Sequence, residues 1–433
     1  MPAKAVCQAH ICAGFGALFA GKPAPARIAV IFWSDYMSGL NELLHAIDAA
    51  AQAGEETILA TVVKVEGSAY RRPGARMLIP LHGRTVGTVS GGCLEQELAR
   101  KAWWLTESGE AVVRRYSTAA QEEEDADDED AALTFGLGCN GTVHVLLERH
   151  DASKQSLLLY VLQWVRATGQ PAALATVISA GRTARVRVGA RMGLNAFMNA
   201  CEDIHCQALQ HTLQGDLRST LARKKSQLMI YASGADEVEV FLEYIAPQRR
   251  LMIFGAGHDA QPLVRFARDL NWQVTVVDGR AHFARPERFP GASQVIVAPI
   301  DEPFNLSRAV DGAAVVIMTH SYRQDRYWLE NVLQCSPAYV GQLGPRERTE
   351  RLLDEMGASA CSPEVVPGFH YPIGLDLGGD TPASVALAIV GEITAYFNER
   401  SGGMLKYRKT TIHQACEPTH SPAVGGLQAK MEA

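Results

Sequence analysis

The chain has 433 residues, which is enough for two or three domains of ordinary size. Hydrophobic residues make up 47% of it and charged residues 20%, a composition that excludes a wholly disordered, collagen-like or coiled-coil protein. Apolar runs all fall short of the roughly 18–20 residues of a membrane span, so no membrane partner is expected.

The net charge of −6 comes from one segment. Eight of the 47 acids lie in residues 122–130, which leaves 39 acids against 41 basic residues elsewhere. A near-neutral body argues against a nucleic-acid-binding protein, and we interpret the acidic segment 121–130 as a solvated loop.

The nine cysteines are odd in number and form no C-x-x-C pair, which excludes a disulfide framework and favours a reducing compartment. Residues 1–36 precede the first clean helical pattern. Their apolar stretch Ile11–Ala20 resembles a weak signal peptide, but the charged region before it is thin. We therefore expect a non-conforming leader, either disordered or arising from an upstream start.

The first half mixes helical and strand patterns in chain order. Helical periodicity predicts helices over three segments: Gly39–Gly54, Cys93–Thr106 and Ser153–Ala167. Short β-branched or alternating runs predict strands over six: Thr57–Glu66, Ala75–Pro80, Arg84–Ser90, Thr142–Glu148, Ala172–Ile178 and Asp236–Ile245. Residues 190–226 are polar and show no regular pattern.

The second half changes to apolar strands separated by helical segments. The expected strands are Arg250–Phe254, Gln273–Asp278, Gln294–Ala298, Ala313–His320 and Ala338–Leu343. This alternation predicts a parallel, doubly wound sheet. The fold class is therefore α/β: an N-terminal α+β domain over 37–249, a Rossmann-like domain over 250–400 and a flexible tail over 401–433.

A glycine-rich turn follows the first of these strands, as G-x-G-x-x-A between a strand and a helix. Gly255 permits the turn, and Gly257 lets the backbone approach a phosphate at the helix N-terminus, next to His258. Asp278 ends the second strand, where an acid meets a ribose hydroxyl or a similar polar group. His320 ends the fourth strand, facing the same crevice. A tight packing turn and a structural histidine remain the alternatives.

A second glycine turn precedes the helix expected at Cys93. Gly91 and Gly92 imply close backbone approach, and the helix N-terminus with its free amides would stabilise a Cys93 thiolate, although Glu95 opposes this. A thiolate is a nucleophile or a soft metal ligand, whereas the alternative is a small buried side chain.

Two further loops have related chemistry. Gly138 and Cys139 repeat the glycine–cysteine arrangement, and a constrained turn carries Arg71, Arg72 and Arg76. Arginine forks bind phosphate or carboxylate, although a surface ion-pair cluster is the alternative. Together the loops suggest a pocket for an anionic ligand that also contacts sulfur.

Several motifs in one order carry a family resemblance. GSAYRRPGARM, GTVSGGCLE and GLGCNG in the first half, with LMIFGAGHDAQPLVRFARDLNWQVTVVD, VVIMTHSYRQD, AYVGQLGPRER and PIGLDLGGDTPASVALAIVGEI in the second, resemble the xanthine dehydrogenase accessory factor family, XdhC/CoxI. The resemblance runs from about Leu40 to Phe397. It implies a cytoplasmic accessory protein, not itself an enzyme, with a Rossmann-like second domain.

The resemblance also implies cargo and partners. Family members bind the molybdenum cofactor (molybdopterin), protect it while a cysteine desulfurase sulfurates it, and deliver it to a xanthine dehydrogenase or related molybdenum hydroxylase; a homodimer is possible. Cys93 and Cys139 would be the thiols of the family's two glycine–cysteine motifs, with Cys93 facing the metal. Three features depart from the family pattern: Asn140 in place of Gly, the longer acidic run and the leader.

The expected function is therefore cofactor binding, with no catalytic residue. The candidate binding residues are Arg71, Arg72, Gly91, Gly92, Cys93, Gly138, Cys139, Gly255, Gly257, His258, Asp278 and His320. Two alternatives remain open: an NAD(P)-dependent oxidoreductase using the Rossmann-like domain, and a thiol-based sulfur transferase acting through Cys93.

Overall fold

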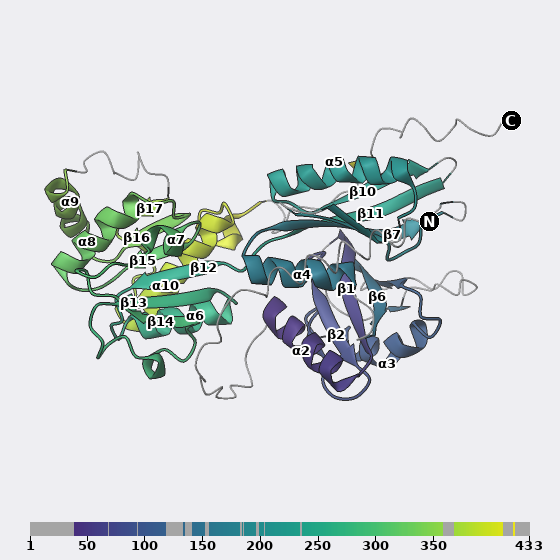
Figure 1. Ribbon diagram of the computed structural model, residues 1–433, viewed down its shortest axis with the longest axis horizontal. Helices are drawn as coiled ribbons and strands as arrows, with labels where there is room; N and C mark the ends of the chain where they lie inside the picture. Colours follow the sequence, from purple (N-terminus) through teal and green to yellow (C-terminus); the bar gives the residue numbers. More distant parts are fainter. Residues whose placement is uncertain are drawn as a thin grey trace. The chain divides into compact units, whose positions relative to one another are not determined.

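Figure 1 shows the computed structural model of the chain. The structure describes residues 39–67, 69–92, 94–117, 133–134, 141–151, 156–181, 184, 186–195, 199–202, 204–233, 236–357, 368–409 and 419–420. The leader, the acidic segment and three candidate residues, Cys93, Gly138 and Cys139, lie outside these described residues.

The first sheet has the strand order β3-β2-β1-β6-β4-β5. Its elements are α2 (Leu40–Ala53), β1 (Thr57–Gly67), β2 (Arg76–Pro80), β3 (Val86–Gly87), α3 (Glu95–Leu105), β4 (Val112–Ser117), β5 (Leu133–Thr134) and β6 (Gly141–His150). All its pairs are antiparallel except β4 with β5. Side chains alternate along β1: Ile58, Ala60 and Val62 pack toward Leu98 of α3, and Leu59 packs against α2 and α4 (Leu157–Thr168).

The second sheet has the order β18-β10-β11-β7-β8-β9. Its elements are α4 (Leu157–Thr168), β7 (Ala172–Ala180), β8 (Arg191–Leu194), β9 (Asn199–Glu202), α5 (Gln207–Arg223), β10 (Gln227–Ser233), β11 (Asp236–Ile245) and β18 (Thr419–His420). Helix α5 covers one face of this sheet, which Figure 1 shows in teal. The opposite face meets the first sheet, directly and through α2 and α4.

Ion pairs from the first sheet to the second reinforce this packing. Arg76 of β2 pairs with Glu243 of β11 at 2.5 Å, and Glu148 of β6 pairs with Arg191 of β8 at 2.5 Å. All four side chains are at most 9% exposed. Removing one partner of such a pair would leave a buried charge uncompensated, so each pair links a strand of the first sheet to a strand of the second.

The third sheet is parallel throughout, as the sequence predicts, in the order β14-β13-β12-β15-β16-β17. Its elements are β12 (Arg250–Phe254), α6 (Ala260–Asp269), β13 (Gln273–Asp278), η1 (Pro286–Arg288), β14 (Gln294–Val297), α7 (Leu306–Val310), β15 (Ala314–Ile317), α8 (Tyr322–Leu333), β16 (Tyr339–Gln342), α9 (Arg346–Glu355), β17 (Phe369–His370) and α10 (Pro382–Phe397). The strand order reverses between β12 and β15, which is where open α/β sheets bind ligands.

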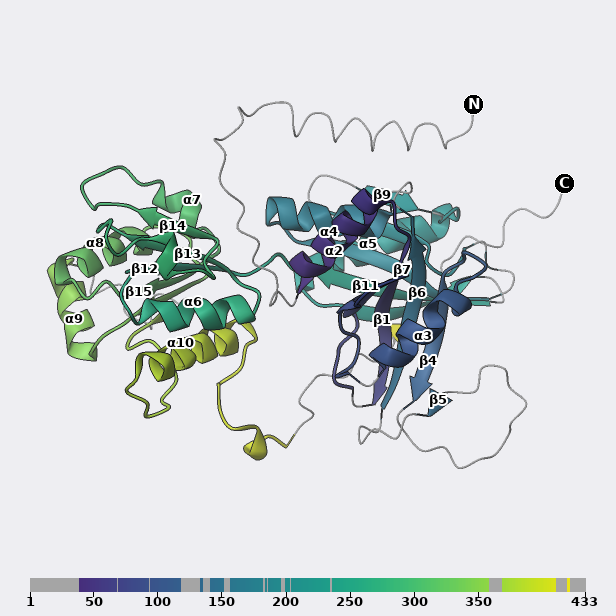
Figure 2. The same cartoon turned by 90° about the horizontal axis from the view of Figure 1, so that it is seen from below.

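Helices cover both faces of this sheet, which Figure 2 shows from a second direction. Helices α6 and α10 pack on the face that carries Leu251, Ile253 and Val316. Helices α8 and α9 pack on the other face, where Phe254 stacks on Trp328 with 4.4 Å between ring centroids. Burial on both faces explains why these strands read as continuous apolar runs in the sequence.

Some sequence predictions were wrong. Residues 190–226, expected to be irregular, contain β8, β9 and α5. The strand expected over Arg84–Ser90 shrinks to Val86–Gly87, because Glu95 binds the backbone that follows. Strand β15 ends at Ile317, so His320 lies in the next loop. The segment expected to be a flexible tail contributes η3 (Leu405–Tyr407) and β18, which pairs with β10.

Within the described ranges, no helix combines the length and the apolar character needed to cross a membrane.

Candidate functional site

The glycine turn after β12 is tied to the neighbouring strands. The N–H of Gly255 donates to the Val277 carbonyl at 2.8 Å, and Gly255 has a φ of +121°. A Cβ at Gly255 would lie 2.4 Å from the Met318 carbonyl oxygen. Only glycine therefore fits this position. The positive φ is at Gly255, the glycine that the sequence assigned to the turn, and not at Gly257.

Asp278 holds this turn in place. Its carboxylate accepts the N–H of Ala256 at 2.8 Å and three bonds from the backbone and guanidinium of Arg280 at 2.8–2.9 Å. Burial alone would raise the pKa of Asp278, but these hydrogen bonds outweigh it and lower the pKa below its ordinary value. The side chain is fully buried and its four acceptor positions are used within the chain. Asp278 therefore stabilises the turn, and its carboxylate has no acceptor position left for a ligand.

A second carboxylate covers the turn. A Cβ at Gly257 would lie 2.6 Å from Asp259 Oδ1, and Asp259 Oδ2 lies 2.6 Å from His320 Nε2. Asp259 makes no side-chain cap to α6. The sequence singled out five residues in this region. All of them lie at or just after the carboxyl ends of β12, β13 and β15, and Asp259 lies there too: Gly255, Gly257, His258, Asp278 and His320.

His320 is held by a buried network beneath it. Its φ of +58° is left-handed, which is uncommon for a residue other than glycine. Thr319, directly before it, donates its N–H and its hydroxyl to Asp325 Oδ1 at 3.1 and 2.5 Å. Arg348 Nη1 lies 2.7 Å from Asp325 Oδ2. This network supports the loop from beneath, while the His320 side chain is 61% exposed.

The second glycine turn is occupied by Glu95. The Glu95 carboxylate accepts from the Thr88 and Ser90 hydroxyls at 2.5 Å, and from the N–H groups of Val89, Ser90 and Gly92 at 2.9–3.2 Å. Burial pushes the pKa of Glu95 upward, but these bonds outweigh burial and lower the pKa to about 2. These three amides are therefore not free to stabilise a thiolate at the next helix.

The arginine turn lies against this glycine turn. The Tyr70 ring lies 3.4 Å from the Cβ position of Gly91, although Tyr70 is 72% exposed. The Arg71 guanidinium lies 5.7 Å from the Tyr70 ring centroid and is exposed. The exposed Tyr70 ring therefore neighbours both Gly91 and Arg71, two of the residues that the sequence proposes for the site.

The other two arginines of this turn behave differently. Arg76 is committed to its buried pair with Glu243 and to the Gly74 carbonyl at 2.9 Å. The side chain of Arg72 is exposed, and its backbone carbonyl accepts the N–H of Ala75 at 3.1 Å, which closes the turn. Arg71 is therefore the arginine of the turn that stands beside Tyr70.

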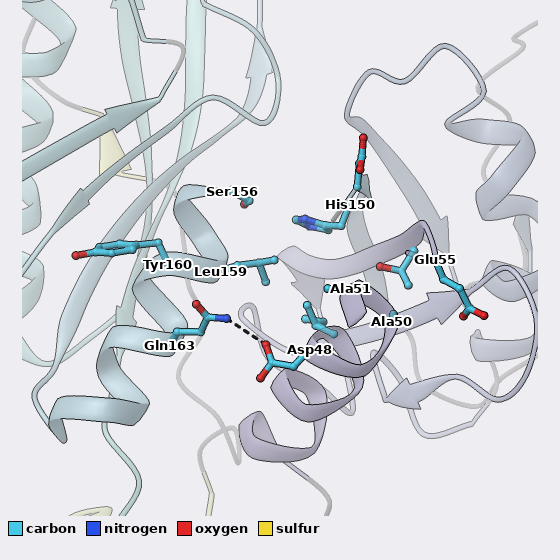
Figure 3. A pocket seen from close by; sticks show the side chains of 12 residues that line it. Asp48, Ala50, Ala51, Glu55, His150, Ser156, Leu159, Tyr160 and Gln163 are labelled. Atoms are coloured by element: carbon cyan, nitrogen blue, oxygen red, sulfur yellow. Dashed lines mark hydrogen bonds between the residues drawn. The ribbon is translucent and has the colours of Figure 1, made fainter. Parts of the chain in front are cut away.

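A hollow elsewhere in the N-terminal part contains none of the predicted residues. It lies between α2, α4 and the ends of β1 and β6, and Figure 3 shows the His150 ring directed into it. His150 Nε2 and Ser156 Oγ are buried without a hydrogen-bond partner. Burial lowers the pKa of His150, which keeps the ring neutral at pH 7. At the rim, Gln163 donates to Asp48 at 3.2 Å.

Sequence reasoning missed three residues that shape these sites, Tyr70, Asp259 and Arg280, and it read a fourth, Glu95, only as a charge that opposes the Cys93 thiolate. Only Glu95 had a local signal, since it lies three residues after Gly92 and bonds back to its N–H, as the acid of a capping box does. Among the described residues, no group of three or more His, Cys, Asp or Glu side chains is arranged to hold a metal ion.

Comparison with known proteins relates both glycine turns to one family. The family model for the XdhC Rossmann domain matches residues 251–393, and the model for the XdhC and CoxI family matches residues 50–117. A relative from Bacillus subtilis (strain 168), named as a probable subunit of xanthine dehydrogenase, is 30% identical over 348 residues, covering 80% of this chain and 95% of the relative. The chain belongs to the XdhC and CoxI family.

Two other family relatives were found. The molybdenum cofactor insertion chaperone PaoD of Escherichia coli (strain K12) is 24% identical over 349 residues, covering 80% of this chain and 85% of PaoD. A crystal structure described as a xanthine dehydrogenase from Bacillus halodurans is 26% identical with a TM-score of 0.63 and covers 84% of this chain and 98% of its own. This XdhC/CoxI chain therefore shares its fold with a solved structure over most of its length.

Proposed function

We propose that this XdhC/CoxI protein binds the molybdenum cofactor and serves the maturation of a xanthine dehydrogenase-type molybdenum hydroxylase in the cytoplasm. The observation that carries the proposal is the surface made by Tyr70, Arg71 and Gly91. It sets an exposed aromatic ring and a guanidinium beside the loop that leads to Cys93.

The chemistry of this surface fits the cofactor, which combines a pterin ring, a terminal phosphate and a molybdenum held by two sulfurs. An exposed Tyr70 ring offers a face for stacking a planar heterocycle. The Arg71 guanidinium suits a phosphate. A thiolate at Cys93 would suit the soft metal centre. Cys93 follows Gly92 directly in the sequence, so the proposal assigns all three kinds of contact to the neighbourhood of this glycine turn.

The names of the relatives support the same function. One is named a molybdenum cofactor insertion chaperone and another a probable subunit of xanthine dehydrogenase. We therefore propose a molybdenum hydroxylase as the partner that receives the cofactor, and a cysteine desulfurase as the partner that supplies sulfur to it. A homodimer is part of the same proposal.

The pyridine-nucleotide alternative is less well supported. In a dinucleotide site, a phosphate approaches the glycine turn and a free acid meets the ribose. Here the Asp259 carboxylate stands over Gly257, and Asp278 has its acceptor positions filled by the turn and Arg280. Like charges at the turn disfavour a dinucleotide phosphate.

The test is cofactor retention by the purified full-length chain from cells that make the cofactor. Oxidation converts released pterin into a fluorescent product, and molybdenum is measured in parallel. We expect Cys93→Ala to lower molybdenum retention and Cys361→Ala, which has no glycine pair next to it in the sequence, to leave it unchanged.

Each alternative gives a different result. NADH binding with turnover and no released pterin would refute the proposal in favour of an oxidoreductase. A persulfide on Cys93, detected by mass spectrometry in protein without pterin, would favour a sulfur transferase. Equal molybdenum retention by the two cysteine variants would remove the thiolate from the site.

A further inference from the structure

The hollow between α2, α4 and the ends of β1 and β6 has the size of a small organic molecule. Its volume is about 170 Å³, and apolar cavities of similar size in other proteins hold one benzene-sized molecule. Apolar side chains form part of its wall, with Ile47 and Ala51 from α2 and Leu159 from α4. The hollow therefore offers a surface for a short hydrocarbon chain, and none of the residues that carry the proposed function lines it.

The charged side chains around this hollow are acidic. Asp48 of α2, Glu55 just after α2 and Asp151 just after β6 line it, and neither lysine nor arginine is among its lining residues in the described part of the chain. Asp48 Oδ1 accepts from Gln163 at 3.2 Å and its Oδ2 lies 3.4 Å from Arg166 Nη2, outside the lining. Acidic side chains around a hollow attract cations and repel anions.

Two polar groups at the base of the hollow lack partners. His150 is only 9% exposed, its ring is directed into the hollow in Figure 3, and its Nε2 has no hydrogen-bond partner. Ser156 Oγ is also buried without a partner, and Ser156 makes no cap bond although it is the N-cap residue of α4. A buried polar atom without a partner is costly unless a ligand or water satisfies it. Both atoms are covered in the structure, and Ser156 can uncover its hydroxyl by turning about the Cα–Cβ bond, since no bond holds it.

His150 does not cancel the acidic charge around the hollow. Burial lowers the pKa of His150, while the charges of Glu148 and Arg191 act on it in opposite directions. The ring is therefore neutral at pH 7, and the hollow keeps its negative character. A neutral imidazole has one acceptor nitrogen and a serine hydroxyl also accepts, so the base of the hollow suits a group that donates hydrogen bonds.

We propose that this hollow binds a small aliphatic ammonium compound. Its ammonium group donates to the Ser156 hydroxyl, in the negative field of the surrounding acids, and its carbon chain lies against Leu159. An ammonium group combines three donors with a positive charge, whereas an alcohol of the same length lacks the charge and a carboxylate has the wrong sign. The site is separate from the surface of Tyr70, Arg71 and Gly91, so the inference does not depend on the proposed function.

The test is a titration of the full-length chain with n-butylammonium, 1-butanol and butyrate, in which saturation-transfer NMR of each probe reports binding. We expect n-butylammonium to bind with a Kd on the order of 1 mM, 1-butanol to bind at least about 5-fold more weakly, and butyrate not to bind. Ala51→Phe should abolish n-butylammonium binding, because the ring fills the hollow. Ala53→Phe is the matched control, since Ala53 is an exposed alanine of the same helix that does not line the hollow.

A second variant separates binding from folding. Ser156→Ala should weaken n-butylammonium binding about 3-fold to 10-fold. It should not lower the melting temperature, because the hydroxyl has no partner in the free protein. Butyrate or 1-butanol binding as tightly as n-butylammonium, no n-butylammonium binding by the parent, or equal n-butylammonium affinity of Ala51→Phe and Ala53→Phe would overturn the inference.

Discussion

Replacing Glu95 with Gln tests whether an internal carboxylate holds the loop before Cys93. The variant keeps the size of the side chain but removes its charge and turns one acceptor oxygen into a donor. That donor then faces the hydroxyl and N–H groups that now bond to the carboxylate. We expect the loop to loosen and the N-terminal domain to lose stability.

The size of the effect follows from the pKa of Glu95. A pKa lowered from 4.5 to about 2 corresponds to ~3 kcal/mol of stabilisation by the folded state. Because the side chain is only partly buried, screening by solvent reduces this to about 1–2 kcal/mol. The contribution is complete above pH 4.5 and is lost as the pH falls toward 2, since acid protonates the unfolded chain first. The gap between variant and parent should therefore be widest at pH 7 and narrow below pH 4.5.

Urea unfolding at pH 7 and pH 4 measures the free-energy difference, and alkylation of Cys93, followed by mass spectrometry, measures loop opening. Glu107→Gln is the control, because Glu107 is an exposed acid just beyond the same helix. We expect Glu95→Gln alone to lose stability and to alkylate faster at Cys93. Parent-like stability at pH 7 together with a parent-like alkylation rate would refute the reasoning.

Three further changes test other parts of the structure. Gly255→Ala should destabilise the Rossmann domain by about 3 kcal/mol in urea unfolding, because Gly255 has a positive φ and a Cβ there would lie 2.4 Å from a backbone carbonyl oxygen. Gly257→Ala should destabilise it less, because a Cβ at Gly257 meets only the end of a side chain. Tyr70→Ala should lower pterin retention about 3-fold to 10-fold. Tyr407→Ala is the control, because Tyr407 is equally exposed and lies beside Lys406, and it should retain pterin like the parent; equal losses in the two variants would exclude stacking on Tyr70. Burial depresses the pKa of His150, so the unfolded chain gains the proton first and the free energy of unfolding should fall as the pH drops below about 6.5. His150→Gln should reduce this dependence of the unfolding free energy on pH.

The parallel sheet was predictable because its strands are buried on both faces. Runs such as Leu251–Phe254 and Ala314–Ile317 are apolar without alternation, and each leads toward a turn or helix signal. Helix α5 was not predictable in the same way. Its buried residues Leu209, Leu213 and Leu217 form one narrow stripe in an otherwise polar segment, and only packing against the second sheet makes it a helix.

The glycine turns were predictable, but their occupants were not. A pattern of glycines indicates where the backbone turns tightly, and it does not specify which acceptor the turn's N–H groups meet. Asp259 and His320 are 61 residues apart in the chain, so only the sheet order brings them together. Tyr70 could be read as part of a loop, but its contact with Gly91 depends on how β2 and α3 pack on β1.

Both glycine turns carry a carboxylate of the chain itself, and this has one electrostatic consequence for each domain. N–H groups at a helix start normally attract a phosphate. Glu95 uses three such groups in the first turn, and Asp259 stands over the second. An anion bound by the N-terminal domain must then rely on a guanidinium, and Arg71 presents one in the open. A guanidinium contact exposed to solvent weakens with salt, whereas stacking on Tyr70 does so much less. If the proposed cofactor binds at this surface, salt should therefore weaken the contact to its phosphate before the contact to its ring.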